Sequence, residues 1–202
     1  SSAASDVYKR QVYRGLTVLP SRTSLVKTLS GPGRVCDPDT RRLLANSRRR
    51  LSRKDDDAVA ARCRVLFESD DEINDAVVTE LAVAVQRPDV ARRLWVSMER
   101  ADASRWLTIW SRAVEIIPDR MAPAPLSVCG LAGWLNGDGA VAAVCARRCE
   151  FMVGTADLPA ALAAIVDAFV PPKLWDVMEH DPTVIAHPLL EEQMGEKLNL
   201  SA

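Results

Sequence analysis

The sequence predicts an all-α domain of antiparallel helical hairpins with tetratricopeptide-like or bundle packing, and three observations lead to this prediction. Apolar residues recur every three or four positions through most of the chain. Runs of strict polar–apolar alternation, which predict strands, are almost absent. With 202 residues, 48% of them hydrophobic, the chain is long enough to bury one sizeable core. We therefore expect helices packed on helices.

The first eleven residues, SSAASDVYKRQ, are similar to the in-frame translation of a transposase-tagging adapter used to prepare sequencing libraries. We interpret residues 1–11 as a disordered, adapter-derived segment. On this interpretation the native N-terminus is missing, and residues 12–180 form a helical domain that is the C-terminal part of a larger protein. Beyond His180 the chain becomes polar, so residues 181–202 are predicted to be a loosely attached tail.

Several helices are predicted in the first half of the domain. Pro20-Ser21 marks the start of one helix, and Gly31-Pro32-Gly33 stops it. Two apolar stripes follow acidic openings at 55–57 and 70–72, where negative charge suits a helix N-terminus. Pro88 ends the second of these helices and begins the next. The stripes consist of Val59, Cys63, Leu66 and Phe67, and of Ile73, Val77, Leu81 and Val85.

The clearest helix runs from Ala103 to Ile117, with Asp102 or Ser104 as its cap and Pro118 after its end. Another stripe precedes Pro171-Pro172, and a short helix from Trp175 to Glu179 follows. The helix from Ala103 to Ile117 carries Trp106, Ile109, Trp110, Ala113, Ile116 and Ile117 on one face. The second stripe consists of Leu158, Leu162, Ile165, Val166 and Phe169.

Charge and cysteine usage narrow the class of protein. The net charge is -1, which argues against a chain built throughout to hold polyanions. The five cysteines are scattered and odd in number, unlike a secreted disulfide framework, so we expect a reducing cytoplasm. No apolar run approaches the roughly 20 residues that span a bilayer, so no membrane partner is expected.

The stretch from Ala122 to Trp175 carries a resemblance to a known family. Its markers are Ala122-Pro123-Ala124, the core Trp134-Leu135-Asn136-Gly137-Asp138-Gly139-Ala140 and the pair Pro171-Pro172. Together with Val18–Arg22, these segments resemble the bacterial family called domain of unknown function 4192, over most of residues 18–175. The resemblance implies an N-terminal α/β part that lies before residue 12. At Val153–Ala156 the chain departs from the family's Asp-Pro-Gly-Tyr-like turn.

The segment Gly137-Asp138-Gly139 has two interpretations. Glycine backbones approach anions closely, so a phosphate-binding loop is one of them. We prefer a structural turn between two helices, with Gly137 as the left-handed cap and Asp138 as the next N-cap. Gly130, Trp134 and Ala142 stand at tetratricopeptide-like spacing around it, but no second copy of the repeat is found.

No catalytic residue, metal site or cofactor is predicted. Cys129, Cys145 and Cys149 are a conceivable thiolate set, yet a fourth ligand and a Cys-x-x-Cys knuckle are lacking, so we interpret them as core residues. As bases for a cysteine nucleophile the chain offers His180 and His187, and both lie in a weakly patterned region.

A basic run from Arg41 to Lys54 is the candidate nucleic-acid contact. No aromatic side chain lies within it to stack on bases, and Arg53 with Asp57 has i,i+4 spacing. We therefore prefer a solvated helix face, and nucleic acid is not the expected partner. The candidate contacts are Arg48, Arg49, Arg50 and Arg53.

Tryptophans supply the candidate protein interface. Trp106 and Trp110 fall on an apolar stripe, whereas Trp95 and Trp175 are less constrained and are expected on an exposed face. We therefore expect an interaction or scaffolding module for a protein partner or for the chain's own missing N-terminal domain. The alternatives are an accessory helical region of an enzyme whose active site lies in that missing part, and nucleic-acid binding through the basic run.

Overall fold

The computed structural model describes residues 26–27, 29–33, 35–68, 73–152 and 157–186. These residues form helices and turns with no strand, so the predicted all-α class is confirmed. The α-helices include α3 (Pro38–Leu51), α4 (Asp56–Glu68), α5 (Asp75–Ala84), α6 (Pro88–Val96), α7 (Ala103–Ile116), α8 (Pro123–Leu135), α9 (Gly139–Glu150) and α10 (Asp157–Asp167). Short 3-10 helices are η1 (Arg100–Asp102), η2 (Asp119–Met121) and η3 (Pro172–Asp176).

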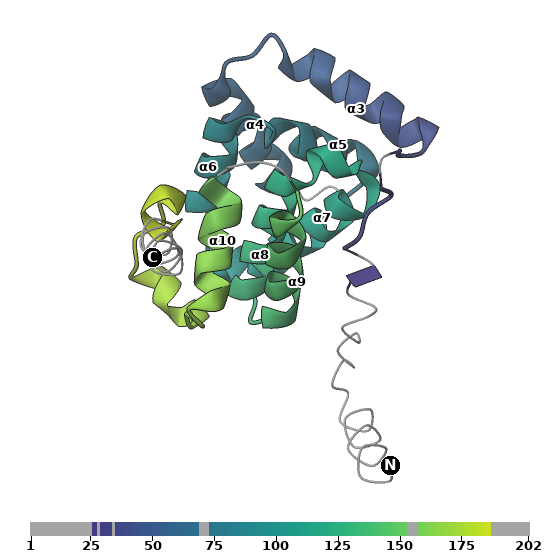
Figure 1. Cartoon of the computed structure of the whole chain (residues 1–202). Coiled ribbons are helices and arrows are strands. Elements are labelled where there is room, and N and C mark those ends of the chain that lie inside the picture. The colour runs from purple at the N-terminus through teal and green to yellow at the C-terminus, as the bar shows by residue number, and fades with distance from the viewer. Residues whose placement is uncertain (1–25, 28, 34, 69–72, 153–156, 187–202) are drawn as a thin grey trace, which may run out of the picture.

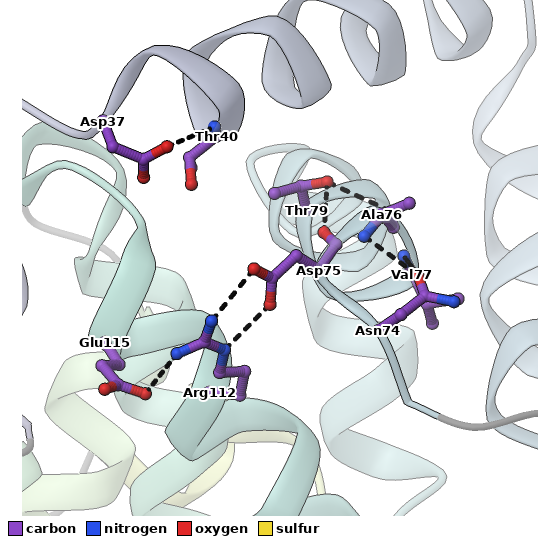
Figure 2. Close-up of polar contacts among 9 residues, drawn as sticks. All are labelled: Asp37, Thr40, Asn74, Asp75, Ala76, Val77, Thr79, Arg112 and Glu115. Carbon is purple, nitrogen blue, oxygen red and sulfur yellow. Dashed lines mark hydrogen bonds and ion pairs between the residues drawn. The ribbon is translucent and has the colours of Figure 1, made fainter.

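Side-chain caps fix where α3 and α5 begin (Figure 2). The Asp37 carboxylate accepts a hydrogen bond from the Thr40 backbone N–H at 2.9 Å, and Pro38 occupies the first turn of α3. The Asn74 side chain accepts from two backbone N–H groups at the start of α5. Arg112 of α7 then holds Asp75 with two hydrogen bonds of 2.8 and 2.9 Å, which ties the first turn of α5 to α7.

The centre of the domain is α8, which packs against α7, α9 and α10. Every residue from Pro125 to Leu135 is buried, so this helix has no solvent-facing side beyond its first turn. Two glycines let α9 approach closely. A Cβ atom added to Gly130 would lie 2.9 Å from the Cys145 Cβ, and one added to Gly133 would lie 2.7 Å from the Val141 Cγ1. Gly130 lies against Cys145, whereas the later Gly133 lies against the earlier Val141. The two helices therefore run antiparallel.

Glu80 on α5 carries a buried charge. It pairs with Arg50 of α3 and with Arg62 of α4, the latter at 3.1 Å. A further arginine, Arg87, donates to the Leu51 carbonyl at 2.7 Å and to the Lys54 carbonyl at 2.8 Å, where α3 ends. The helix α3, at the outer edge of the molecule (Figure 1), thus packs on α5 through buried residues such as Leu44 and Leu51 and is also tied down by guanidinium groups.

The structure corrects one cap and two boundaries. Asp102 precedes α7 but makes no capping hydrogen bond through its side chain, because η1 already leads into the helix. The short C-terminal helix is η3, which begins three residues before Trp175 because Pro172 suits a first helical turn. The predicted tail at 181 starts too early, since Asp181 pairs with Arg92 and Ala186 belongs to the core.

Other expectations fall outside the described residues, namely the segments at 1–11 and 12–19, the acidic opening at 70–72 and the departure at 153–156. Among the described residues, no helix is long and apolar enough to cross a membrane.

Candidate functional site

The C-terminal segment is anchored by three tryptophans from α6, α8 and η3. The Trp175 ring meets those of Trp95 and Trp134 edge-on, with centroids 6.4 and 5.8 Å apart. Trp175 donates its indole N–H to the Met98 carbonyl at 2.8 Å, and the His180 ring stacks on it at 4.1 Å. This cluster holds the chain after α10 against the body of the domain.

The prediction that Trp95 and Trp175 lie on an exposed face is wrong. Their exposed fractions are 0% and 1%. The physical reason is mutual coverage, because η3 folds back and lays one indole against the other. Neither ring can reach a partner unless the cluster opens.

An aromatic residue of this region that is exposed is Phe169, with 90% of its surface in solvent. It follows α10, where the N–H groups of Phe169 and Val170 donate to the carbonyls of Val166 and Ile165, both at 3.2 Å. In this helix-ending motif Phe169 takes a φ of 50°, a left-handed conformation that costs a non-glycine residue about 1 to 2 kcal/mol. Trp134 fixes the next residue by donating its indole N–H to the Val170 carbonyl at 2.8 Å.

Residues 169–177, which we call the 169–177 segment, present further apolar surface. Leu174 is 41% exposed and Val177 is 81% exposed. The segment therefore combines a backbone that is hydrogen-bonded to the body of the domain with exposed apolar side chains. The prediction that Phe169 lies on the buried stripe of α10 was wrong. The helix ends at Asp167, and Phe169 then takes a left-handed backbone conformation that turns its side chain away from the stripe.

The basic run divides between two roles. Arg50 pairs with the buried Glu80 and so fastens α3 to α5. Arg48 lies on the side of α3 near η2 and donates to the Met121 sulfur at 3.0 Å, while Arg49 donates to Asn46 on α3 itself. Arg48 and Arg49 are exposed, as is Arg53 in the turn after α3. The structure thus brings Arg48 and Arg49 to the surface of one helix and takes Arg50 out of the candidate set.

The three aspartates at 55–57 do not neutralise the exposed arginines of the basic run. Arg53 and Asp57 are on no common helix, because α3 ends at Leu51 and α4 begins at Asp56, so the i,i+4 pairing expected for them is wrong. Asp55 caps α4 by accepting from the Ala58 N–H at 2.7 Å. Asp56 pairs at 2.8 Å with Arg87, the residue before α6. Asp57 pairs with Arg93 of α6.

The cysteines are buried free thiols. Burial raises the pKa of Cys63 to about 12 and that of Cys149 to about 11. A hydrogen bond with Cys129, together with burial, raises the pKa of Cys145 as well. These thiols stay protonated near neutral pH, which is unfavourable for a nucleophile or a metal ligand. In the described part of the chain, no cluster of three or more His, Cys, Asp or Glu residues is arranged to hold a metal ion.

Between α8 and α9, residues 136–138 form a tight turn, and Gly139 is the first residue of α9. Gly137 has a φ of 80°, and the Asp138 carboxylate accepts from the Val141 N–H at 3.1 Å. A Cβ atom added to Gly137 or Gly139 would meet nothing within 4 Å, so the glycines line an open turn and not a cradle.

A hollow lined by charges of both signs lies between α6, α8 and α10. Its volume is about 380 Å³, and Arg92, Arg120, Asp89 and Asp157 contribute to its lining. Arg92 already pairs with Asp181 beside it. The hollow therefore offers charges of both signs and no defined set of acid, base and nucleophile.

Sequence reasoning missed two residues that organise the domain, Glu80 and Phe169. Glu80 is the single charged residue within the apolar run 76–85, a signal that predicts either a buried ion pair or a ligand. Phe169 stands two residues before Pro171-Pro172, where a helix can no longer continue.

Comparison with known proteins supplies the family. No curated protein and no solved structure matches the chain. A family model matches residues 1–173, which covers most of the domain described above and includes the three markers found in the sequence. The chain therefore belongs to the family described as Domain of unknown function (DUF4192).

Proposed function

We propose that this domain is a helical interaction module that binds a protein partner through the 169–177 segment. The observation that carries the proposal is Phe169, which is 90% exposed and holds a left-handed backbone conformation. Glycine would adopt that conformation without strain and would leave no apolar ring in water. A strained, exposed aromatic residue at a fixed position is a feature typical of functional surfaces.

The packing around Phe169 supports a binding role. The Trp134–Val170 hydrogen bond and the tryptophan cluster fix the backbone on which the ring is displayed. A backbone held in place before binding loses little conformational entropy when the ring it carries enters a pocket, so more of the ring's burial appears as affinity. Aromatic side chains are also enriched at the centres of protein interfaces.

We place the module in the cytoplasm. All five cysteines are free and buried, and none forms a disulfide in the structure. This usage matches a reducing compartment, since secreted domains commonly use paired cysteines for stability.

The test compares two matched exposed phenylalanines. Wild type, Phe169→Gly and Phe151→Ala are each used to capture proteins from a bacterial lysate, and a captured protein is then purified and its affinity measured directly. Phe151 serves as the control because it is 86% exposed at the end of α9, outside the 169–177 segment. We expect Phe169→Gly to lose at least about tenfold in affinity, and Phe151→Ala to match wild type.

Thermal unfolding separates binding from folding. Because glycine relieves the left-handed strain, Phe169→Gly is expected to keep or raise the melting temperature. The proposal fails if no protein depends on Phe169, or if both variants weaken binding equally.

A further inference from the structure

The outward face of α3 is a cationic surface independent of the 169–177 segment. At 100° per residue, Arg41 and Arg48 share one edge of this face, and Arg42 and Arg49 share its apex. All four are exposed, and α3 lies at the outer edge of the molecule (Figure 1). The opposite side of the helix is buried and consists of Thr40, Leu44, Ser47 and Leu51.

Few carboxylates compensate these arginines. Arg42 pairs with Asp39 at 3.0 Å, on the same helix. Arg41 donates to the Cys36 carbonyl at 3.4 Å, while Arg48 and Arg49 contact a sulfur and an amide oxygen. Within the described ranges, Arg41, Arg48 and Arg49 form no ion pair, although the whole chain carries a net charge of -1. Positive charge is therefore concentrated on one helix.

The composition of the face selects the kind of polyanion. Between the arginines the outward positions are small, Ala45 and Ser52, so the face has no apolar side chain to insert into a bilayer or to anchor a protein interface. No aromatic residue stands between Val35 and Cys63, so unpaired bases find nothing to stack on. Guanidinium groups bind phosphate oxygens with two hydrogen bonds.

We propose that the outer face of α3 binds the phosphate backbone of double-stranded nucleic acid without reading its base sequence. The arginine pairs repeat every seven residues, a rise of about 10.5 Å along the helix, so two levels of contact are available. Phosphate contacts position a protein on a duplex but carry no sequence information. With four such contacts, a plot of the logarithm of the binding constant against the logarithm of the salt concentration has a slope of about −3.6.

The test measures fluorescence anisotropy of a labelled DNA duplex of mixed sequence between about 50 and 200 mM salt. Arg41→Gln/Arg49→Gln is compared with Arg64→Gln/Arg147→Gln, which removes the same charge from exposed positions on α4 and α9. We expect the α3 variant to reduce the size of the slope by about 1.8, and the control to leave the slope of wild type unchanged. Circular dichroism checks that both variants are folded.

Three outcomes overturn the proposal. One is the absence of salt-dependent duplex binding by wild type, and another is an equal effect of the two double variants. The third is tighter binding to a single strand, or to vesicles containing phosphatidylserine, than to the duplex. The Phe169→Gly variant is expected to bind duplex like wild type, so failure of the protein-interaction proposal would leave this one standing.

Discussion

Two helices of the domain, α8 and α3, are held in place by different kinds of contact. Around α8 the contacts are apolar and close, and Gly130 and Gly133 bring the α9 side chains within van der Waals distance of its backbone. Around α3 the buried Leu44 and Leu51 are joined by polar contacts that arginines make. Arg50 reaches the buried Glu80, and Arg87 binds carbonyl groups at the C-terminal end of the helix.

The difference teaches where the domain tolerates change. Close apolar packing loses stability when a single methyl group is added, because neighbouring backbones have no room to move. Contacts made by long, partly exposed arginines can rearrange, and water replaces part of what is lost. We therefore expect changes at α8 to affect the whole domain, and changes at the Glu80 ion pairs to affect mainly the attachment of α3.

The largest effect is expected for Gly130→Ala, which places a methyl group against Leu162 and Cys145, and for Gly133→Ala, which places one against Val141. Alanine normally stabilises a helix relative to glycine by roughly 0.5 to 1 kcal/mol. Here overpacking outweighs that gain, and each substitution is expected to cost about 1 to 3 kcal/mol. Urea denaturation followed by circular dichroism measures the change in the free energy of unfolding.

Gly139→Ala is the matched control for this prediction. Gly139 begins α9, and a Cβ atom there meets nothing within 4 Å. The substitution is expected to leave stability unchanged or slightly raised. If Gly130→Ala proved as stable as Gly139→Ala, close approach of α8 and α9 would not be a requirement of the fold.

Much of this fold could be predicted because apolar periodicity records burial. The stripe predicted from 103 to 117 coincides with α7, whose buried residues include Trp106 and Trp110. Helix ends were harder to place. Asp102 has the right residue type for a cap, yet its backbone is already helical because η1 precedes it, so its side chain makes no capping bond.

The candidate site was predicted less well, because the residues that cover or pair with one another there are far apart in the sequence. Trp95 and Trp175 are separated by 80 positions, and nothing in their local sequence shows that they cover each other. Glu80 likewise meets Arg50 and Arg62 from two other helices. The exposure of Phe169 was accessible from the sequence, because a proline pair forces the helix before it to end.

An intermediate effect is expected for Glu80→Gln, which removes the charge shared by two arginines. The Glu80 side chain is 3% exposed while the Arg50 and Arg62 side chains are 54% and 40% exposed, so both arginines remain hydrated after the change. The cost is therefore expected to be about 1 to 2 kcal/mol, near the lower end for a lost charged hydrogen bond. Hydrogen exchange should rise most across α3.

Glu115→Gln provides the matched comparison, because Glu115 pairs with Arg112 at 2.8 Å on the surface. Its side chain is 50% exposed, so the substitution is expected to change stability by less than about 0.5 kcal/mol. Exchange that rose equally in α8 and α3 after Glu80→Gln would contradict the separate attachment of α3.

The smallest effect is expected at Asp181, the ion pair at the C-terminal edge. A hydrogen bond from the Thr183 side chain, and then one from Arg92, lower the pKa of Asp181 below its ordinary value of 3.8. A carboxylate whose pKa is lowered by folding stabilises the fold above that ordinary value, and the contribution is lost as the pH falls below it. Asp181→Asn should therefore be slightly less stable than wild type at neutral pH, with a difference that shrinks below pH 3.8. Urea midpoints measured on both sides of that pH check the sign. A difference that stays constant would assign the role of Asp181 to the hydrogen bonds that asparagine also makes.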